Sequence, residues 1–428
     1  MFGSFGSRSI TPFFSRRIGL DNDRNKIPIL AGVRLTGKLD NNWRIGLMNV
    51  QTNAVAETRT PAVNFTTAAI QRKLFARSNV GLIFVNRAQF LSDSAGNNDW
   101  KLDKKQYNRI IGLDYRLFSA DGKWLGKAFY HRTLAPPKYQ RKNPFASATS
   151  VEYRSRDFNA RTSFEVVGEG YEAQAGFVQR TNYYRTEPNI NLVFYPKLAH
   201  INSWSIGSDG DVFWRLSDNK LLDWDFSPLV FGINWRNNAR LTVIPLRMNQ
   251  VYLFSDFDPT RTKGKVLPSG STYIFTDMTR ATFGSDSRQP FSVEIDASAG
   301  EYFNGSRVNV VTTLAYRWQP YGVFSVDVNY NQFKMPDGFN SPTLWLISPR
   351  VDLSFNRNVF LTTFLQYNNQ ENNMNLNARF QWRFAPVSDL FLVYTDNYFA
   401  ADNSALGYNA FQTKNRGLVL KCTYWLNL

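Results

Sequence analysis

The amino-acid sequence predicts an all-β protein: a transmembrane antiparallel up-and-down β-barrel of about 22 strands, within a range of about 18 to 22. The first observation is that Leu344–Leu428 alternates apolar and polar residues strand after strand. The second is that the chain contains no run of about 18 apolar residues, the length that a membrane-spanning helix needs. The third is an even spacing of turn residues between apolar segments along the whole chain.

The segment Met374–Phe384 shows the alternation most clearly. One parity is entirely apolar: Met374, Leu376, Ala378, Phe380, Trp382 and Phe384. The other is entirely polar or cationic: Asn375, Asn377, Arg379, Gln381 and Arg383. Successive side chains of a strand point to opposite faces, so this pattern predicts an apolar outer face and a polar inner face. Gly417–Leu428 repeats it up to the last residue, which is typical of outer-membrane barrels.

Strand signals follow one another along the chain, and short connections such as Asp121-Gly122 and Asn304-Gly305 carry hairpin-turn chemistry. The predicted strands are Ile27–Leu39, Trp43–Thr52, Asn64–Phe75, Asn79–Phe90, Tyr107–Phe118, Trp124–Leu134, Ala146–Arg156, Ala160–Val167, Tyr171–Arg180, Asn189–Tyr195, Ile201–Leu216, Leu221–Trp235, Ala239–Phe254, Thr272–Thr282, Phe291–Tyr302, Arg307–Trp318, Val323–Phe333, Leu344–Asn356, Val359–Asn368, Met374–Phe384, Leu390–Asp396 and Gly417–Leu428.

Loop lengths test this count, because outer-membrane barrels place long loops at one end and short turns at the other. Counted literally, the first three long connections and the last three fall at opposite ends. The contradiction disappears if Tyr171–Tyr195 is one long strand. Counting Pro12–Leu20 as the first strand then places both termini at the short-turn end.

The formal net charge of +16 raises the question of which negatively charged partner the chain contacts. Nucleic-acid binding is the usual interpretation of a basic chain. Here the cations are spread over alternating strand positions and loops, so a basic lumen, or basic residues that face lipid phosphates at the membrane rim, explains the charge better. The single cysteine, Cys422, excludes an internal disulfide framework. The N-terminus lacks the pattern of a signal peptide, so we expect the chain to be the C-terminal part of a longer precursor, in which residues 1–428 form a single barrel domain.

Two end motifs carry a resemblance to a known family. The first is Phe13-Phe14-Ser15-Arg16-Arg17-Ile18-Gly19-Leu20, followed by Ile27–Gly32 and Leu35–Lys38; the second is Ser388–Tyr394, followed by Leu418–Trp425; Ala76–Gly81 also fits. Together they resemble an uncharacterised outer-membrane barrel family, common in Bacteroidota, whose longer members carry a module similar to carbohydrate-binding family nine before the barrel. The resemblance implies a barrel fold and an outer-membrane location. The module is absent here, and the family supplies no catalytic residues.

Candidate catalytic and metal-binding groups are sparse, and we predict that the chain is not an enzyme and holds no cofactor. The two histidines are His131, which shares a parity with Lys127 and is expected to face the lumen, and His200, in a turn; no nucleophile elbow accompanies them. Glu294 and Asp296, two apart on one strand face, are the best candidate pair for glycoside hydrolysis. Asp21-Asn22-Asp23-Arg24-Asn25 resembles half of a calcium loop but lacks the glycine and the distal glutamate. Arg16 and Arg17 are adjacent, so in a strand one would point into the lumen and the other toward lipid phosphate at the membrane rim. Alternatively, the pair fixes the register of a first strand.

The polar parities supply the candidate functional residues. The lumen-lining candidates are Arg34, Arg44, Arg116, Arg317, Asp327, Arg350, Asp352, Arg379, Arg383 and Lys421. Rings of arginine and lysine favour anions, and interleaved asparagine and glutamine suit sugar hydroxyls. We expect Arg379, Arg383 and Lys421 to make a positive surface near the last five strands, because Asp327 and Asp352 are too few to neutralise them. Alternatively, these charges pair across a filled lumen.

These observations leave two main functional hypotheses for a protein of the bacterial outer membrane. The first is a porin-like channel for anionic or oligosaccharide solutes. The second is a non-transporting anchor or scaffold for a carbohydrate-binding module or a partner protein at the periplasmic side or the cell surface. An outer-membrane hydrolase is a distant third. The expected partners are outer-membrane lipid and lipopolysaccharide, possible partner proteins and a carbohydrate or anionic solute, and no nucleic acid.

Overall fold

The computed structural model describes residues 2–7, 9–21, 25–55, 57–58, 60–90, 106–402 and 407–425. In this part of the chain the only helical elements are three short 3-10 turns: η1 (Phe2–Ser4), η2 (Ser15–Arg17) and η3 (Pro137–Tyr139). The strands are β1 (Ile10–Thr11), β2 (Ile29–Lys38), β3 (Trp43–Thr52), β4 (Ala62–Leu74), β5 (Ser78–Phe90), β6 (Tyr107–Phe118), β7 (Trp124–Leu134), β8 (Phe145–Arg154), β9 (Phe158–Val167), β10 (Phe177–Val178), β11 (Tyr183–Thr186), β12 (Asn189–Phe194), β13 (Ile201–Arg215), β14 (Leu221–Trp235), β15 (Arg240–Ile244), β16 (Arg247–Tyr252), β17 (Thr272–Gly284), β18 (Phe291–Tyr302), β19 (Gly305–Trp318), β20 (Gly322–Lys334), β21 (Thr343–Ser354), β22 (Val359–Asn368), β23 (Asn373–Ala385), β24 (Ser388–Phe399) and β25 (Thr413–Thr423).

The prediction of an all-β, antiparallel, up-and-down barrel is confirmed. β1 and β10 form a separate two-stranded sheet, and all the other strands belong to one barrel sheet. β11 and β12 are two pieces of one strand position, interrupted next to Pro188, and β15 and β16 are another, interrupted at Pro245. Proline cannot donate to the ladder, which explains both interruptions. The described residues therefore supply 21 strand positions in the wall, inside the predicted range of strand numbers.

Two predicted strands are wrong. Pro12–Leu20 is not a wall strand: it follows the two residues of β1 and turns into η2, so the Arg16-Arg17 pair lies in a 3-10 turn. Tyr171–Tyr195 is not one long strand either. Residues 171–176 form no strand, β10 pairs with β1, and only β11 and β12 enter the wall. In both cases a segment that alternates in sequence packs against the sheet instead of joining it.

The last predicted strand is shorter than expected. β25 ends at Thr423, and residues 426–428 lie outside the described residues, as do Asn22, Asp23 and Arg24 of the calcium-like segment. The preceding strand, β24, is longer than predicted and continues to Phe399.

The chain divides into two compact units. The N-terminal unit comprises Met1–Asn191 and Asp209–Trp224, and the C-terminal unit comprises Leu192–Ser208 and Asp225–Leu428. In each unit the sheet has an outward face and an inner face, and antiparallel ladders fix which residues share a face.

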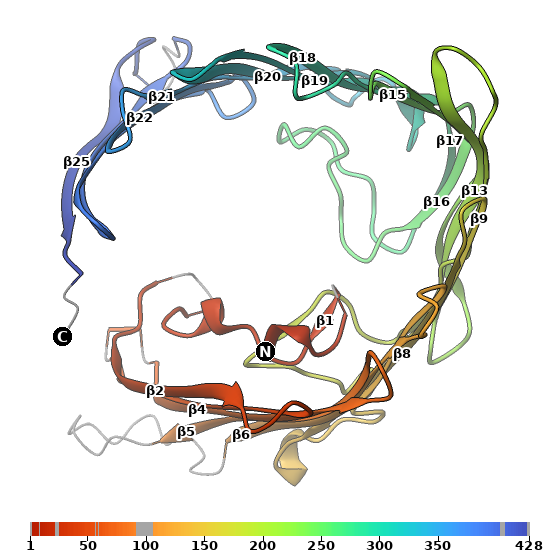
Figure 1. The fold of residues 1–428 in the computed structure, drawn as a ribbon, viewed down its shortest axis with the longest axis vertical. Helices are drawn as coiled ribbons and strands as arrows, with labels where there is room; N and C mark the ends of the chain where they lie inside the picture. The colour runs from red at the N-terminus through yellow and green to blue at the C-terminus, as the bar shows by residue number, and fades with distance from the viewer. Residues whose placement is uncertain are drawn as a thin grey trace. The chain divides into compact units, whose positions relative to one another are not determined.

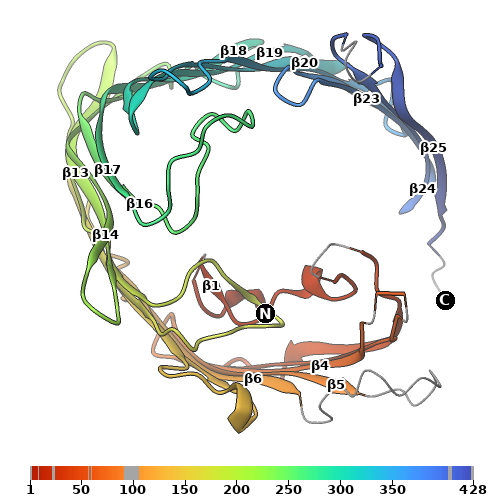
Figure 2. The same ribbon diagram turned by 180° about the vertical axis from the view of Figure 1, so that it is seen from behind.

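The inner face of the N-terminal unit is covered by two segments of the chain itself. Residues 2–7, 9–20 and 168–182 lie along the inside of the wall built by β2 to β9, where Figures 1 and 2 show them in red and yellow. They join each other through the β1–β10 pairing, in which Ile10 lies opposite Val178. We call these two segments the inner strap.

The inner strap buries an apolar core against the wall. Phe2, Phe5, Ile10 and Phe13 of the strap pack with inward residues of the strands, such as Ile83, Val85 and Ile110. Outward neighbours such as Ile111 and Leu113 are exposed. The predicted apolar-out, polar-in rule is therefore wrong for this part of the wall, because the strap removes its inner face from water and makes apolar side chains favourable on both faces.

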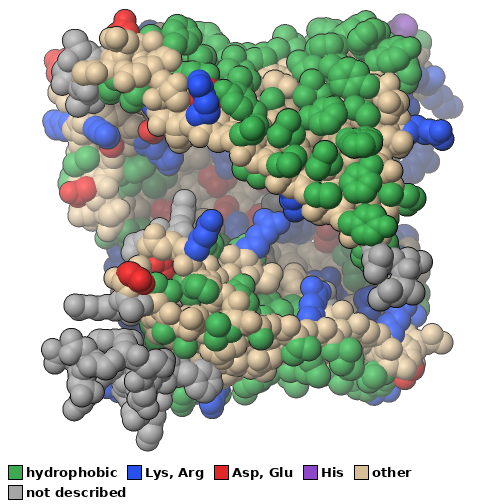
Figure 3. Space-filling model, turned by 90° about the vertical axis from the view of Figure 1, so that its left-hand side faces the viewer, with side chains coloured by type: hydrophobic (Ala, Val, Ile, Leu, Met, Phe, Trp, Pro, Cys, Tyr) green, Lys and Arg blue, Asp and Glu red, His purple; other side chains and the backbone are tan. Residues whose placement is uncertain are grey.

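The C-terminal unit follows the predicted alternation. The outward rows of β20 to β25 are largely apolar, including Val326, Pro349, Leu361, Phe380, Leu392 and Leu420. The ion pair of Asp396 and Arg416, near the long-loop end of β24 and β25, is an exception. Figure 3 shows hydrophobic side chains gathered over the outward surface of the C-terminal strands. Because a continuous apolar outward surface on a β-barrel is solvated by lipid, this surface is the one that a barrel presents to the outer membrane.

Long connections leave one end of the sheet in each unit. In the N-terminal unit they are 53–61, 135–144 and 168–182, and in the C-terminal unit 253–271, 335–342 and 400–412. The hairpins at the other end are short. Connection 253–271 bends inward from β16 and β17 and lies radially inside the wall (Figure 1). No helix among the described residues is long and apolar enough to span a membrane.

Candidate functional site

A basic pocket lies at the short-turn end of the N-terminal unit. It encloses about 340 Å³ and is lined by residues of β2 to β5 and their hairpin turns: Lys38, Asn41, Asn42, Arg44, Gln71, Lys73, Arg77, Ser78 and Asn79. Lys38 lies opposite Arg44 in the ladder, Arg44 opposite Gln71, and Lys73 opposite Asn79. Residues directly opposite in a ladder share a face, so one inner surface carries the side chains of these five strand residues: Lys38, Arg44, Gln71, Lys73 and Asn79.

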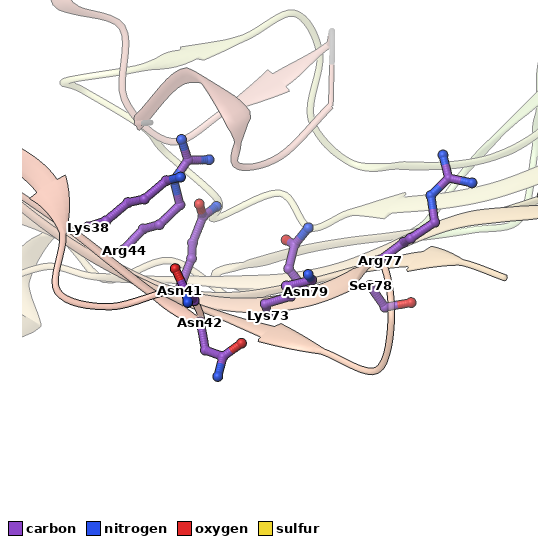
Figure 4. A pocket seen from close by; sticks show the side chains of 9 residues that line it. Lys38, Asn41, Asn42, Arg44, Lys73, Arg77, Ser78 and Asn79 are labelled. Carbon is purple, nitrogen blue, oxygen red and sulfur yellow. The ribbon is translucent and has the colours of Figure 1, made fainter. Parts of the chain in front are cut away.

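The cations of this pocket have no acidic partners. In the described part of the chain, no carboxylate forms an ion pair with Lys38, Arg44 or Lys73, and the same holds for Arg77 in the hairpin turn. Figure 4 shows the Lys38 and Arg44 side chains close together and the Arg77 side chain extending from its turn. Four uncompensated positive charges around a hollow raise the local concentration of anions. The three asparagines add neutral amide donors.

The basic surface continues from the pocket along the inner face. Arg116 lies opposite Asn79, and Lys127 lies opposite Arg116. Lys127 donates a hydrogen bond to the carbonyl of Gly6 in the inner strap, and its Nζ lies 3.8 Å from Oδ2 of Asp114. The pocket therefore meets the strap through a lysine that holds the strap in place.

Two buried carboxylates attach the inner strap to the wall. Oδ2 of Asp114 accepts a hydrogen bond from the Gly6 amide at 2.9 Å, and Oδ1 lies 2.8 Å from Nε2 of His131. The hydroxyl of Tyr171 lies 3.5 Å from Nδ1 of the same histidine. His131 thus faces the inner side of the wall, where the sequence placed it, but it is wholly buried under the strap.

Glu165 forms the second attachment. Its carboxylate accepts hydrogen bonds from the hydroxyls of Ser7 and Ser9 and from the hydroxyl of Tyr183. Asp114 and Glu165 occupy the same row of the ladder, which runs from Gly81 through Asp114, Phe129 and Ala148 to Glu165. Hydrogen bonds to a buried carboxylate are stronger than neutral ones, so these contacts fix the strap more firmly than the apolar packing alone.

The motif Phe13–Leu20 belongs to the strap. Phe13 is buried and meets Phe2 edge to face, with ring centroids 5.8 Å apart. Nη1 of Arg17 donates to the carbonyl of Gly176 at 2.8 Å. Gly19 adopts a φ of +84°, which favours glycine. The remaining motif residues are Phe14, Ser15, Arg16, Ile18 and Leu20, of which Phe14 and Leu20 are exposed and Ile18 packs against the core.

The structure places the lumen-lining candidates of the N-terminal unit on the inner rows. Arg34 lies opposite Met48, which belongs to the buried core, and its guanidinium lies 5.9 Å from the centroid of the Phe2 ring. Arg44 lines the basic pocket, and Arg116 shares the face of Asp114.

In the C-terminal unit one cross-strand row joins three of the candidates. Arg317 lies opposite Val323, Val323 opposite Asp352, Asp352 opposite Thr362, and Thr362 opposite Arg379. Neighbouring rows carry Asp327, which accepts a hydrogen bond from Thr313, and Lys421, which lies opposite Phe391. These residues therefore share one face of β19 to β25.

Two arginines on this face are paired with carboxylates. Arg350 binds Asp352 at 2.7 Å, and Arg383 binds Asp389 at 3.1 Å. Asp389 was missed by the sequence analysis, although its parity on β24 would have revealed it. Arg379 has no carboxylate partner among the described residues; it donates to Gln381 and lies over the Phe391 ring. Among the described residues, Arg307, Arg317, Arg379 and Lys421 on this face form no ion pair, while Arg350 and Arg383 are neutralised, so the expected positive surface is smaller than the residue list suggests.

The candidate glycosidase pair is also engaged by arginines. Glu294 binds Arg240 at 2.7 Å and Asp296 binds Arg280 at 2.6 Å. Two carboxylates that are each held by a guanidinium are poor candidates for a general acid, which must carry a proton. His200 lies in a turn, where its carbonyl accepts a hydrogen bond from the Arg236 amide. The described residues contain no group of three or more side chains placed to bind a metal ion.

Comparison with known proteins identifies no family. No family model matches the chain, and no curated protein matches it. Among solved structures, the chain is similar to the ferric enterobactin receptor of Pseudomonas aeruginosa, with 10% identity over 86% of this chain and 64% of that one, and a TM-score of 0.41. It is also similar to the siderophore receptor PirA of Acinetobacter baumannii, with 11% identity over 91% and 70% of the two chains and a TM-score of 0.42. The chain thus spans less than two thirds of the first receptor's length.

Proposed function

We propose that this barrel is a passive channel of the outer membrane that favours anionic or oligosaccharide solutes. The observation that carries the proposal is the basic pocket, in which Lys38, Arg44, Lys73 and Arg77 form no ion pair with any carboxylate in the described part of the chain. A fixed positive potential on the inner face attracts anions and repels cations, which is how charged rings give a pore its selectivity. The uncompensated Arg317 and Arg379 on the inner rows of the C-terminal unit support the same preference.

The proposal requires no chemistry from the protein. Solutes would exchange their water shell for arginine, lysine and asparagine donors along the inner face and leave again, and such weak contacts allow passage. No step depends on a nucleophile or a metal ion. The carboxylates that sequence reasoning had considered for catalysis are bound to arginines.

A second candidate function is a non-transporting anchor for a partner protein or a carbohydrate-binding module. The inner strap favours it, because Phe2, Phe5 and Phe13 fill the inner face of the N-terminal unit and reduce the space available for solutes. In this case the paired inner charges would serve stability rather than permeation.

Planar-bilayer recording on the purified, folded protein separates the two functions. We expect ohmic current and, under a potassium chloride gradient, a reversal potential displaced toward that of chloride. Replacing Lys38, Arg44 and Lys73 with glutamine should move this potential toward zero. Arg357→Gln, which removes one charge from an exposed hairpin turn, is the matched control and should have little effect. A folded barrel that carries no current would exclude the channel and support the anchor.

A further inference from the structure

A second hollow in the N-terminal unit lies at the end opposite the basic pocket. It encloses about 950 Å³ and is bounded by the long-loop ends of β3 to β7, by η3 and by the inner strap. We call it the loop-end pocket. The strap contributes its floor through residues such as Arg17, Ala173 and Val178. Concave sites for ligands the size of a small oligosaccharide have volumes of this order.

Cations outnumber acids around this pocket. Its lining holds Arg17, Arg87, Lys138 and Arg141 against two carboxylates, Asp21 and Glu172. The acids are already engaged: Glu172 accepts a hydrogen bond from the Gln174 side chain at 3.0 Å, and Asp21 accepts two from Asn25. The remaining positive charge would attract a carboxylate or another anionic group on a ligand.

The pocket also presents the groups that recognise hydroxyls. Oε1 of Gln89 is buried and accepts no hydrogen bond from the described residues. A buried acceptor without a partner is unfavourable, and a ligand hydroxyl that donates to it would remove the penalty. Nε2 of Gln106 donates to the hydroxyl of Tyr139 at 3.2 Å, which holds this ring at the side of the pocket. Tyr139 is 42% exposed and combines an apolar ring face with a polar tip.

From these three features we infer that the loop-end pocket is a binding site for an acidic oligosaccharide. Glutamine amides and the tyrosine hydroxyl would bind sugar hydroxyls, the Tyr139 ring would pack against the C–H face of a sugar ring, and Lys138 and Arg141 would pair with its carboxylate. The inference builds on the proposed function, since it names the class of solute that the barrel receives at its long-loop end. It does not depend on current flowing through the barrel.

Isothermal titration of the folded protein in detergent with trigalacturonic acid tests the site, and the fully methyl-esterified trisaccharide serves as the uncharged probe. We expect saturable binding of the acid that is at least tenfold tighter than binding of the ester. Lys138→Gln combined with Arg141→Gln should abolish this preference. Tyr139→Ala should weaken the binding of both trisaccharides by about tenfold. Both changes lie on exposed residues, and Arg357→Gln is again the control.

The outcomes distinguish this site from the channel. Absence of binding by a folded barrel that conducts anions would overturn the inference and leave the proposed function intact. Equal binding of acid and ester, or binding that survives both pocket variants, would also overturn it. Acid-selective binding that the variants abolish, in a barrel without current, would support the site and remove the channel.

Discussion

Nε2 of His131 lies 2.8 Å from Oδ1 of Asp114, and both side chains are buried between the wall and the inner strap. The other oxygen of the same carboxylate binds the Gly6 amide. One wall residue therefore joins a histidine of the neighbouring strand to the N-terminal segment. A substitution at this attachment should therefore loosen the inner strap while the strands of the wall stay paired.

Asp114→Asn should loosen the strap. The amide keeps the shape of the side chain but removes the charge that strengthens the bonds to Gly6 and His131, which corresponds to about 1–3 kcal/mol. We expect amide exchange at Phe5 and Gly6 to become about tenfold faster or more, with exchange in β19 and β20 unchanged. Asp121→Asn, in an exposed hairpin turn, is the control. Unchanged exchange at Gly6 would show that the apolar contacts alone hold the strap.

Gly176→Ala should separate the two segments of the inner strap from each other. A Cβ at this position would lie 2.1 Å from the carbonyl oxygen of Thr11, a backbone atom that cannot move aside without breaking the β1–β10 pairing. We expect the segment around Thr11 to become sensitive to protease while the barrel keeps its heat-modifiable migration on gels. Gly417→Ala adds the same methyl group to β25 with no atom within 4 Å and should do neither. Protease resistance in both variants would contradict the packing described.

The inward connection 253–271 should lose order in acid. Its turn is built on Asp258, whose carboxylate accepts hydrogen bonds from the amides of Thr260, Thr262 and Gly264. Burial tends to raise the pKa of Asp258, but hydrogen bonds from Thr260 and from backbone amides outweigh it and hold this pKa below the ordinary value of 3.8. A lowered folded-state pKa means that the stabilisation is complete above 3.8 and is lost as the pH falls through the folded value.

A spin label on Lys263→Cys, in a Cys422→Ser background, reports this change. We expect the label to be immobile near neutral pH and to become mobile only below pH 3.8, and Asp258→Asn to make it mobile at every pH. A label whose mobility does not depend on pH in the otherwise unchanged loop would refute the role of Asp258.

Arg379 and Arg383 should each contribute to anion selectivity. Arg379→Gln removes a cation that has no ion-pair partner among the described residues, and Arg383→Gln leaves the charge of Asp389 without its guanidinium. Each variant lowers the charge of the inner face by one unit, so each should shift the reversal potential away from the anion side. Adding Asp389→Asn to Arg383→Gln restores the net charge of the pair and should return the potential close to its original value. No shift for Arg383→Gln would mean that the Arg383–Asp389 pair does not face the solute, and the assignment of the inner face would fail.

The fold class and the faces of the C-terminal strands could be predicted from the residue pattern alone. In Met374–Phe384 the alternation is complete because lipid solvates one face of the strand and water the other. Apolar residues are therefore favoured at every second position and polar residues at the positions between them. The same physics explains why Arg317, Asp352 and Arg379 were assigned to one face before their register was known. The number of strands also followed from the pattern to within its stated range.

What covers the inner face of the N-terminal unit depends on contacts between segments that are far apart in the chain, and the residue pattern did not reveal it. Phe13–Leu20 and Tyr171–Arg180 alternate like strands, but they pack across a sheet whose inward residues, such as Ile83 and Ile110, are apolar. Their partners are distant in the chain: Glu172 binds Thr133, 39 residues away, and Arg17 binds Gly176, 159 residues away. No local period records such distances. The basic pocket was hidden for the same reason: Lys38 lies at the β2–β3 hairpin, Lys73 and Arg77 lie at the β4–β5 hairpin, and the ladder register is what brings the two hairpin ends to one surface.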